Sequence, residues 1–281
     1  MAPSPHESSP RPPEPQNALL RDPSARSPEL QDVILHDPSV RSPEHAKWHK
    51  PGTQEFLDPQ SVFRIRTFRP GDASFPPGAA GWREWCEGEG LFKDAAPLMY
   101  AGDPALLFRP TLGLVCSAHC PGTILLETYR FIRNISADGP TIIGGFHSPM
   151  ERNCLETLLV HHVPLVWCPG RRLNSRSVPR EWRDALAGHR LLLLSPFTDK
   201  QRRVDRALAR LRNVFVCALA ETLFVPHARP GGAVASLVRL AVEKGKQVIT
   251  LADPENAEIV RQGAVSVEVG ELIGKYKKRG L

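Results

Sequence analysis

Short apolar runs alternate with amphipathic stretches from residue 111 to residue 267. The apolar runs predict strands at 112–117, 141–144, 165–168, 191–194, 223–226, 247–251 and 265–267. The stretches between them predict helices at 122–136, 150–161, 179–187, 200–219, 233–244 and 255–261. Strands that alternate with helices are typical of βα units. We therefore expect an α/β fold, a Rossmann-like doubly wound and mainly parallel sheet.

In such a sheet, ligands bind outside the carboxyl ends of the strands. Three loops that contain glycine and proline follow predicted strands, at 116–122, 144–149 and 227–232, and each precedes a predicted helix. Glycine lets the backbone approach a phosphate, and the amides at a helix N-terminus favour an anion. Ordinary βα turns would have the same composition. The candidate ligand-binding residues in these loops are Ser117, His119, Gly144, Gly145, Phe146, His147, Gly231 and Gly232.

The loops carry no nucleotide-binding signature. Neither G-x-G-x-x-G nor the lysine of a phosphate-binding loop occurs in them, so no dinucleotide or ATP cofactor is expected. Phe146 could stack on a nucleic-acid base, or it could be buried in the loop.

The predicted helix 200–219 has two unlike faces. At 100° per residue, one stripe is apolar, formed by Val204, Ala207, Leu208, Leu211 and Phe215. The opposite face carries Arg202, Arg203, Arg206 and Arg210. Between residues 171 and 212, twelve basic side chains face four acidic ones, a regional excess of +8 in a chain whose net charge is +6. Such an excess favours contact with a polyanion over a solvated charged face. The candidate DNA-contacting residues here are Lys200, Arg202, Arg203, Arg206, Arg210, Arg212 and Asn213.

Apart from the loops and the basic helix, few residues in the sequence indicate a chemical function. The six cysteines stand singly in apolar stretches without a C-x-x-C pair, which indicates reduced thiols and a cytoplasmic protein. We expect no metal, because Cys116, His119, Cys120, His147, Cys154 and Cys168 match no compact zinc-ligand spacing. No catalytic constellation can be assigned, so an enzyme is not expected. No signal peptide or apolar run of membrane-spanning length is present, and no membrane partner is expected.

Four segments are expected along the chain. Residues 1–60 hold twelve of the 28 prolines, repeat the motif D-P-S-x-R-S-P-E at 22–29 and 37–44, and predict a disordered tail. A partner-binding role for the repeat stays open. Residues 61–105 predict a small irregular lead-in, residues 106–270 the Rossmann domain, and residues 271–281 a basic tail.

Four short motifs stand in order along residues 98–269. They are L-V-C-S at 114–117, I-G-G at 143–145, Arg212 and Asn213 followed by V-C-A-L-A at 216–220, and P-G-G at 230–232. Through these motifs, residues 98–269 resemble the DNA-processing protein family known as DprA or Smf. That family has I-V-G-S-R at the first place, an S-G-G turn at the second, R-N-R-x-I-A-G-L-S at the third and the start of an S-G-S-L-x-T-A turn at the fourth.

The chain also departs from the family pattern. Ala118 and His119 replace the arginine of the first loop, and Val214 replaces the third residue of R-N-R. The second loop has F-H-S-P-M at 146–150 in place of the family's polar signature, and no winged helix is expected after 275–279. Arg202 to Arg212 could compensate for the changed loops.

The resemblance implies a homodimeric mediator of DNA recombination that binds single-stranded DNA and loads a strand-exchange recombinase during transformation. The alternatives are a nucleotide-binding protein and a lysine-decarboxylase-like phosphoribohydrolase, whose motif is P-G-G-x-G-T-x-x-E. Val234 and Ala235 replace its Gly-Thr, and Leu237 or Val238 stands near the position of its catalytic glutamate. Without that carboxylate, no acid or base for glycosidic cleavage is evident.

Overall fold

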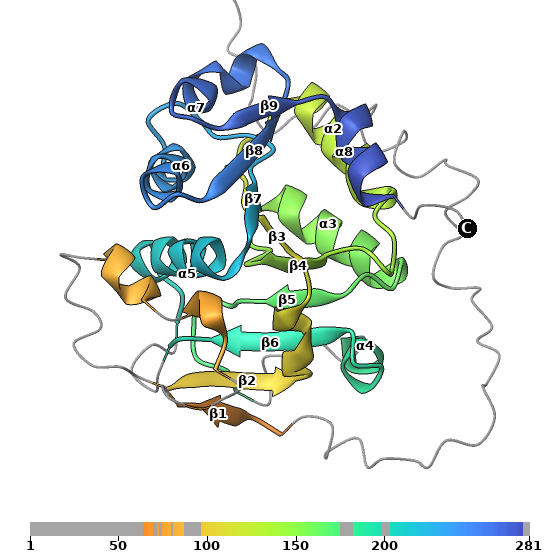
Figure 1. The fold of residues 1–281 in the computed structure, drawn as a ribbon, viewed down its shortest axis with the longest axis vertical. Helices are drawn as coiled ribbons and strands as arrows, with labels where there is room; N and C mark the ends of the chain where they lie inside the picture. Colours follow the sequence, from red (N-terminus) through yellow and green to blue (C-terminus); the bar gives the residue numbers. More distant parts are fainter. Residues whose placement is uncertain are drawn as a thin grey trace, which may run out of the picture. The chain divides into compact units, whose positions relative to one another are not determined.

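A computed structural model describes residues 64–69, 72, 75–79, 81–86, 97–174, 182–197 and 203–277. The tail predicted at 1–60 lies outside these residues. One sheet of nine strands runs through the described part, in the order β1-β2-β6-β5-β4-β3-β7-β8-β9 (Figure 1). Its strands are β1 (Arg66–Phe68), β2 (Leu98–Gly102), β3 (Thr111–Leu114), β4 (Thr141–Gly144), β5 (Leu165–Trp167), β6 (Leu191–Ser195), β7 (Thr222–Phe224), β8 (Gln247–Leu251) and β9 (Val265–Val267).

In the sheet order from β6 through β5, β4, β3, β7 and β8 to β9, each pair of adjacent strands is parallel. This confirms the predicted fold class. The chain adds β4, β5 and β6 on one side of β3, then returns across the sheet and adds β7, β8 and β9 on the other. The order of strands therefore reverses at β3. In open sheets of this kind, ligands bind in the crevice at that reversal.

Helices cover both faces of the sheet (Figure 1). The α-helices are α2 (Gly122–Arg133), α3 (Pro149–Val160), α4 (Arg183–Ala187), α5 (Arg206–Leu219), α6 (Ala233–Glu243), α7 (Ala257–Arg261) and α8 (Val269–Tyr276). Short 3-10 helices lie at η2 (Pro77–Ala79), η3 (Trp82–Cys86), η4 (Pro104–Phe108) and η6 (Pro254–Asn256). Within the described residues, none of the helices combines the length and the apolar character that crossing a bilayer demands.

Successive strand residues enter two different cores, which explains the continuous apolar runs in the sequence. Leu112 and Leu114 pack with α2 and α3, whereas Val115 and Ile143 pack on the side of α5 and α6. Gly113 lets α5 approach β3, because a Cβ there would lie 2.9 Å from the Cβ of Ala220. Helices therefore cover both faces of the central strands. The loops at the ends of the strands are the part of the sheet that is left for a ligand to contact.

Three elements were not predicted from the sequence. The lead-in, expected to be irregular, contributes β1 and β2, and β2 pairs with β6 in the antiparallel direction. Helix α8 lies where the basic tail was expected to begin, and it packs on α2 through Leu272 and through Tyr276, whose ring centroid lies 5.8 Å from that of Phe131. The sheet is therefore wider, and one face better covered, than the sequence pattern indicates.

Lys246 connects the end of α5 to β8. Its half-buried ammonium group donates to the carbonyl oxygens of Ala218, at 2.9 Å, and Ala220, at 2.7 Å, and burial lowers its pKa. We expect Lys246→Met to lower the free energy of unfolding by about 1–3 kcal/mol, because the last carbonyls of α5 would lose a charged donor. Urea denaturation would measure this. The exposed Lys244→Met is the control, expected to change stability by less than about 0.5 kcal/mol, and equal effects would contradict the capping role.

Candidate nucleic-acid interface

The three loops predicted from the sequence meet at one edge of the sheet. They follow β3, β4 and β7, which are neighbours and parallel, so their carboxyl ends lie together. The loops comprise residues 115–121, 145–148 and 225–232, and α2, α3 and α6 begin directly after them. We call this edge the carboxyl rim. The predicted convergence of the three loops is confirmed.

Ser117 joins the first loop to the third. Its backbone N–H donates to the carbonyl oxygen of His227 at 3.1 Å, and its hydroxyl oxygen accepts from the backbone N–H of Arg229 at 2.9 Å. Ser117 is nearly buried, while the adjacent Ala118 and His119 are exposed. A change in the first loop is therefore transmitted to the third.

A buried asparagine fixes the third loop. Asn256 donates from Nδ2 to the carbonyl oxygens of Pro226, at 2.8 Å, and Leu251, at 3.0 Å. Its Oδ1 lies 3.1 Å from Nδ1 of His227, which is also buried. These contacts tie the loop after β7 to the loop after β8, so the rim at the strand reversal is rigid. No feature of the sequence analysis had singled out His227 or Asn256.

The helix N-termini at the rim fall into two kinds. At α3 and α5, the side chain of the N-cap residue accepts a backbone N–H of the first turn. The hydroxyl of Ser148 accepts the N–H of Glu151 at 3.2 Å, and the carboxylate of Asp205 accepts the N–H of Leu208 at 2.8 Å.

By contrast, α2 and α6 have no side-chain cap and no acidic residue in the first turn. Because α2 and α6 follow β3 and β7, the two open N-termini flank the strand reversal. Their first-turn amides suit an anionic ligand. An acidic side chain lies beside each of them: Asp253 accepts from the hydroxyl of Thr123 in α2 at 3.3 Å, and Glu258 accepts the N–H of Gly231 before α6 at 3.3 Å.

The second loop is closed by its own carboxylate. Buried Glu151 accepts the backbone N–H groups of His147 and Ser148 through Oε2, at 2.8 and 3.0 Å. Its Oε1 accepts the N–H of Cys116 in the first loop at 2.8 Å. The expectation that second-loop amides cradle a phosphate is therefore wrong for His147, whose amide already has an anionic acceptor. The sequence analysis had not singled out Glu151.

The glycines of the second loop accommodate two buried side chains. A Cβ at Gly144 would lie 2.8 Å from the ring of Phe146, and a Cβ at Gly145 would collide with the guanidinium of Arg212. Phe146 has a positive φ of 47° and is 4% exposed. Of the two readings of Phe146, burial is the one observed. Gly144 and Gly145 are thus required by packing.

Arg212 does not belong to the exposed cationic face. It is 4% exposed, and its Nε donates to Oδ1 of Asn213 at 2.8 Å. Burial lowers its pKa, while Glu151 and Cys168 act in the opposite direction, and burial raises the pKa of Cys168 to about 12. Arg212 therefore packs beneath the second loop and is not exposed as the predicted cationic face requires, while Asn213, which is half-buried, orients Arg212. The predicted contact of Asn213 with DNA stays a prediction.

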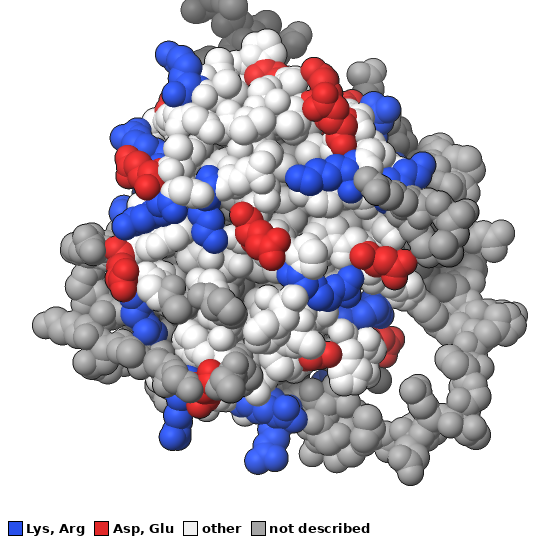
Figure 2. All heavy atoms as spheres, in the orientation of Figure 1, with Lys and Arg blue, Asp and Glu red and all other residues white. Residues whose placement is uncertain are grey.

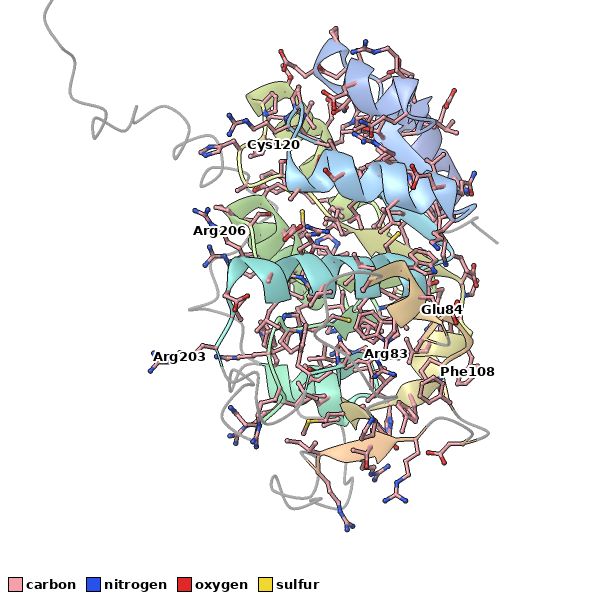
Figure 3. The ribbon with its side chains drawn as sticks, turned by 90° about the vertical axis from the view of Figure 1, so that its left-hand side faces the viewer. Arg83, Glu84, Phe108, Cys120, Arg203 and Arg206 are labelled. Carbon is pink, nitrogen blue, oxygen red and sulfur yellow. The ribbon has the colours of Figure 1, made fainter. Side chains whose placement is uncertain are left out.

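Helix α5 begins later than the pattern predicts. Its N-cap is Asp205, so Arg203 lies in the segment before the helix, and Lys200 and Arg202 lie outside the described residues. Val204, assigned to the apolar stripe, is 40% exposed, and Ala207 is exposed as well. Of the predicted arginines, Arg206 and Arg210 are exposed on α5. Figure 3 shows Arg203, Arg206 and Cys120 along one side of the molecule, and Arg83, Glu84 and Phe108 toward the other.

Three further arginines lie in loops of the carboxyl rim. Arg171 and Arg172 follow β5 and are half-buried, and Arg229 in the third loop is exposed. The loop after β5 packs beside the segment before α5, where a Cβ at Gly170 would lie 3.0 Å from Val204. Arg171, Arg172 and Arg229 each stand in a loop that follows an apolar strand, and this position in the sequence could have identified them as candidate ligand-binding residues. On the side drawn in Figure 2, Lys and Arg alternate with Asp and Glu.

The described cysteines form no metal site. All six are free of disulfides, and within the described residues no three His, Cys, Asp or Glu side chains are placed to hold a metal ion. The Cys120 thiol and burial raise the pKa of Cys116, whereas the Cys116 thiol lowers the pKa of Cys120.

The family model for DNA recombination-mediator protein A matches residues 82–271 of the chain. The chain belongs to this family. It is therefore a DNA-processing protein of the recombination-mediator type, and this agrees with the expectation that it acts by binding rather than by catalysis.

Two solved structures share the fold. DNA processing protein A from Streptococcus pneumoniae is 17% identical, with a TM-score of 0.59 over 79% of this chain and 77% of that one. DNA processing protein A from Helicobacter pylori, whose structure concerns its single-stranded DNA binding mode, is 18% identical, with a TM-score of 0.57 over 76% of this chain and 96% of that one. No curated protein sequence matches significantly.

Proposed function

We propose that this mediator binds single-stranded DNA along the carboxyl rim, with phosphates at the open N-termini of α2 and α6. The observation that carries the proposal is the contrast between these two helices and their neighbours. The amides of α3 and α5 are satisfied by Ser148 and Asp205, whereas those of α2 and α6 are directed at the strand reversal without a cap. Backbone amides of this kind bind phosphate without reading a base.

The exposed arginines extend the site beyond one phosphate. Arg229 lies in the loop that opens α6, and Arg203, Arg206 and Arg210 lie at and beside the start of α5. Side chains spread over the rim suit a polymer of phosphates better than a single nucleotide. The Helicobacter pylori protein, which has the same fold, binds single-stranded DNA, and this likeness supports the same ligand class here.

Charge reversal tests the proposal. Arg203→Glu with Arg206→Glu should weaken binding of oligothymidine at least tenfold near 0.1 M salt. Each lost phosphate contact should also reduce the slope of log affinity against log salt by about 0.7. Fluorescence anisotropy over a salt series would measure both. Arg239→Glu with Arg261→Glu, exposed on α6 and α7, is the control with the same charge change. Equal weakening by the control, or no weakening by the variant at Arg203 and Arg206, would remove the assignment.

The resemblance and the family assignment together support three finer proposals. The mediator acts in the cytoplasm, forms a homodimer, and delivers a strand-exchange recombinase to the bound strand. Sedimentation of the full chain, alone and with the host recombinase, would measure its self-association and its association with the recombinase. A monomer that binds DNA but leaves recombinase loading unchanged would reject the homodimer and the delivery of the recombinase, and would retain the cytoplasmic location.

A small nucleotide is the second candidate ligand, because uncapped helix N-termini such as those of α2 and α6 also suit its phosphate. Thermal stabilisation by a nucleoside monophosphate, without a comparable shift from oligothymidine, would favour it. The phosphoribohydrolase alternative has less support, since Val234, Leu237 and Val238 are buried apolar residues of α6. Release of free base would revive that alternative.

A further inference from the structure

Two tryptophans lie side by side at the carboxyl rim, next to the second loop. Trp167 is the last residue of β5 and pairs with Gly144, the last residue of β4. Its indole N–H donates to the carbonyl oxygen of Gly145 at 3.2 Å. The ring centroid of Trp182, the N-cap of α4, lies 5.0 Å from that of Trp167. Both tryptophans are half-buried, so each keeps part of its ring exposed, unlike the buried Phe146.

The contacts of the two rings hold them in fixed positions. The indole nitrogen of Trp167, its one polar side-chain atom, is occupied by Gly145, and both rings pack against the core on the side of α2 and α3. Their planes are 86° apart, so the rings meet edge to face and are not stacked on one another. A fixed aromatic ring loses little conformational entropy when a ligand packs on it. The pair is therefore a preformed apolar surface at the edge where we place the DNA.

Cationic side chains stand close to this aromatic pair in the chain. Arg171 and Arg172 follow Trp167 in the same loop, directly after β5. The buried hydroxyl of Ser195, at the end of β6, donates to the carbonyl oxygen of Arg171 at 2.8 Å and fixes the loop. An aromatic ring accepts the face of a base, and a nearby arginine accepts its phosphate. A duplex keeps its base faces stacked inside, so this combination favours a single strand.

We propose that Trp167 and Trp182 form a stacking site for an unpaired base of the bound strand. This rests on the proposed function, which places the phosphates and leaves the bases without a contact. In the sheet, β5 stands two strands from β3, about 10 Å at the ordinary spacing of paired strands, so a short single strand can contact both the strand reversal and the tryptophans. Stacking tolerates any base, because every base has an aromatic face.

An oligonucleotide that lacks bases separates stacking from phosphate contact. Oligothymidine and an abasic strand of the same length have the same phosphates, so the ratio of their affinities measures what the bases contribute. The wild-type protein should bind oligothymidine about 5- to 100-fold more tightly than the abasic strand, the range expected for one stacked base. Tryptophan fluorescence, which a stacked base quenches, should fall with oligothymidine and stay unchanged with the abasic strand.

Variants of Trp182 assign the effect to the pair. Trp182→Leu keeps an apolar side chain without an aromatic face, so it should reduce the affinity ratio several-fold and leave binding of the abasic strand unchanged. Trp182→Phe should keep most of the ratio. Trp85→Leu is the matched control, because Trp85 is also half-buried and lies on η3, with its ring centroid 5.8 Å from Nζ of Lys246. Thermal denaturation would establish that each variant is folded.

The two strands also distinguish the possible failures. Equal affinity of the wild-type protein for oligothymidine and the abasic strand would overturn the stacking site, and so would an unchanged ratio in Trp182→Leu. Either result would leave the phosphate contacts of the proposed function in place. If the wild-type protein binds neither strand, the proposed function fails, and the stacking site fails with it.

Discussion

Replacing Glu151 with alanine should lower the free energy of unfolding by about 3–5 kcal/mol, a large part of the stability of an ordinary domain. The carboxylate accepts three backbone N–H groups, from Cys116, His147 and Ser148, and it lies near the buried guanidinium of Arg212. Its removal would leave those amides without their acceptor and Arg212 without the nearest carboxylate. Urea denaturation followed by tryptophan fluorescence would measure the loss.

Two companion variants separate the contributions to this effect. Glu151→Gln keeps an oxygen acceptor and should cost less than Glu151→Ala. Glu151→Ala combined with Arg212→Met should cost less than the sum of the two single changes, because the second change removes the buried charge that the first leaves uncompensated. A loss below about 1 kcal/mol for Glu151→Ala, or strict additivity in the double variant, would contradict the role given to Glu151.

The parallel part of the fold could be predicted because its residues obey one simple rule. Strands β3 to β8 are buried on both faces over most of their length, so each appears in the sequence as an apolar run between turn-forming residues, and only the edge strand β9 among the predicted strands is largely exposed. The elements that escaped prediction lack this pattern. Strand β2 has a mixed burial pattern and ends at Gly102, whose φ is 106°, and α8 contains Gly270 and Gly274, which weaken a helical pattern.

The candidate site was predicted less well than the fold, for two reasons. First, Asp205 is an N-cap, a local signal that places the start of α5 at Arg206 and excludes Arg203 from the helix. Second, Arg212 lies four residues after Leu208 and three before Phe215, so it shares their buried face. Both signals were in the sequence, but the density of arginines favoured a single charged face.

The role of Glu151 could be predicted only in part. The motif S-x-x-E at 148–151 is a capping box, and it correctly places the start of α3. The contact from Glu151 to the amide of Cys116 joins residues 35 positions apart, and no periodicity encodes such a contact. The same holds for Asn256, which fixes Pro226 from 30 residues away. Long-range polar contacts of this kind decide which loop amides are open to a ligand.

A carboxylate placed at the start of α6 should raise stability and weaken DNA binding at the same time. Ala233 is the first residue of α6, is exposed, and follows the N-cap Gly232. Ala233→Asp places a negative charge in the first turn of α6, which contains no acidic residue, so it should stabilise the fold by about 0.3–1 kcal/mol. The same charge would occupy the proposed phosphate position and repel the strand, and we expect oligothymidine affinity to fall about 10- to 100-fold, equivalent to about 1.4–2.8 kcal/mol.

The opposite signs of these two effects distinguish the site from a purely structural helix end. Ala233→Asn has nearly the same shape without the charge, so it should bind oligothymidine within a few-fold of the wild-type protein. Thermal denaturation and fluorescence anisotropy on the same preparations give both quantities. If Ala233→Asp binds as tightly as Ala233→Asn, the phosphates do not lie at α6, and binding at the rim would then depend on its arginines, whose charge reversal tests them independently.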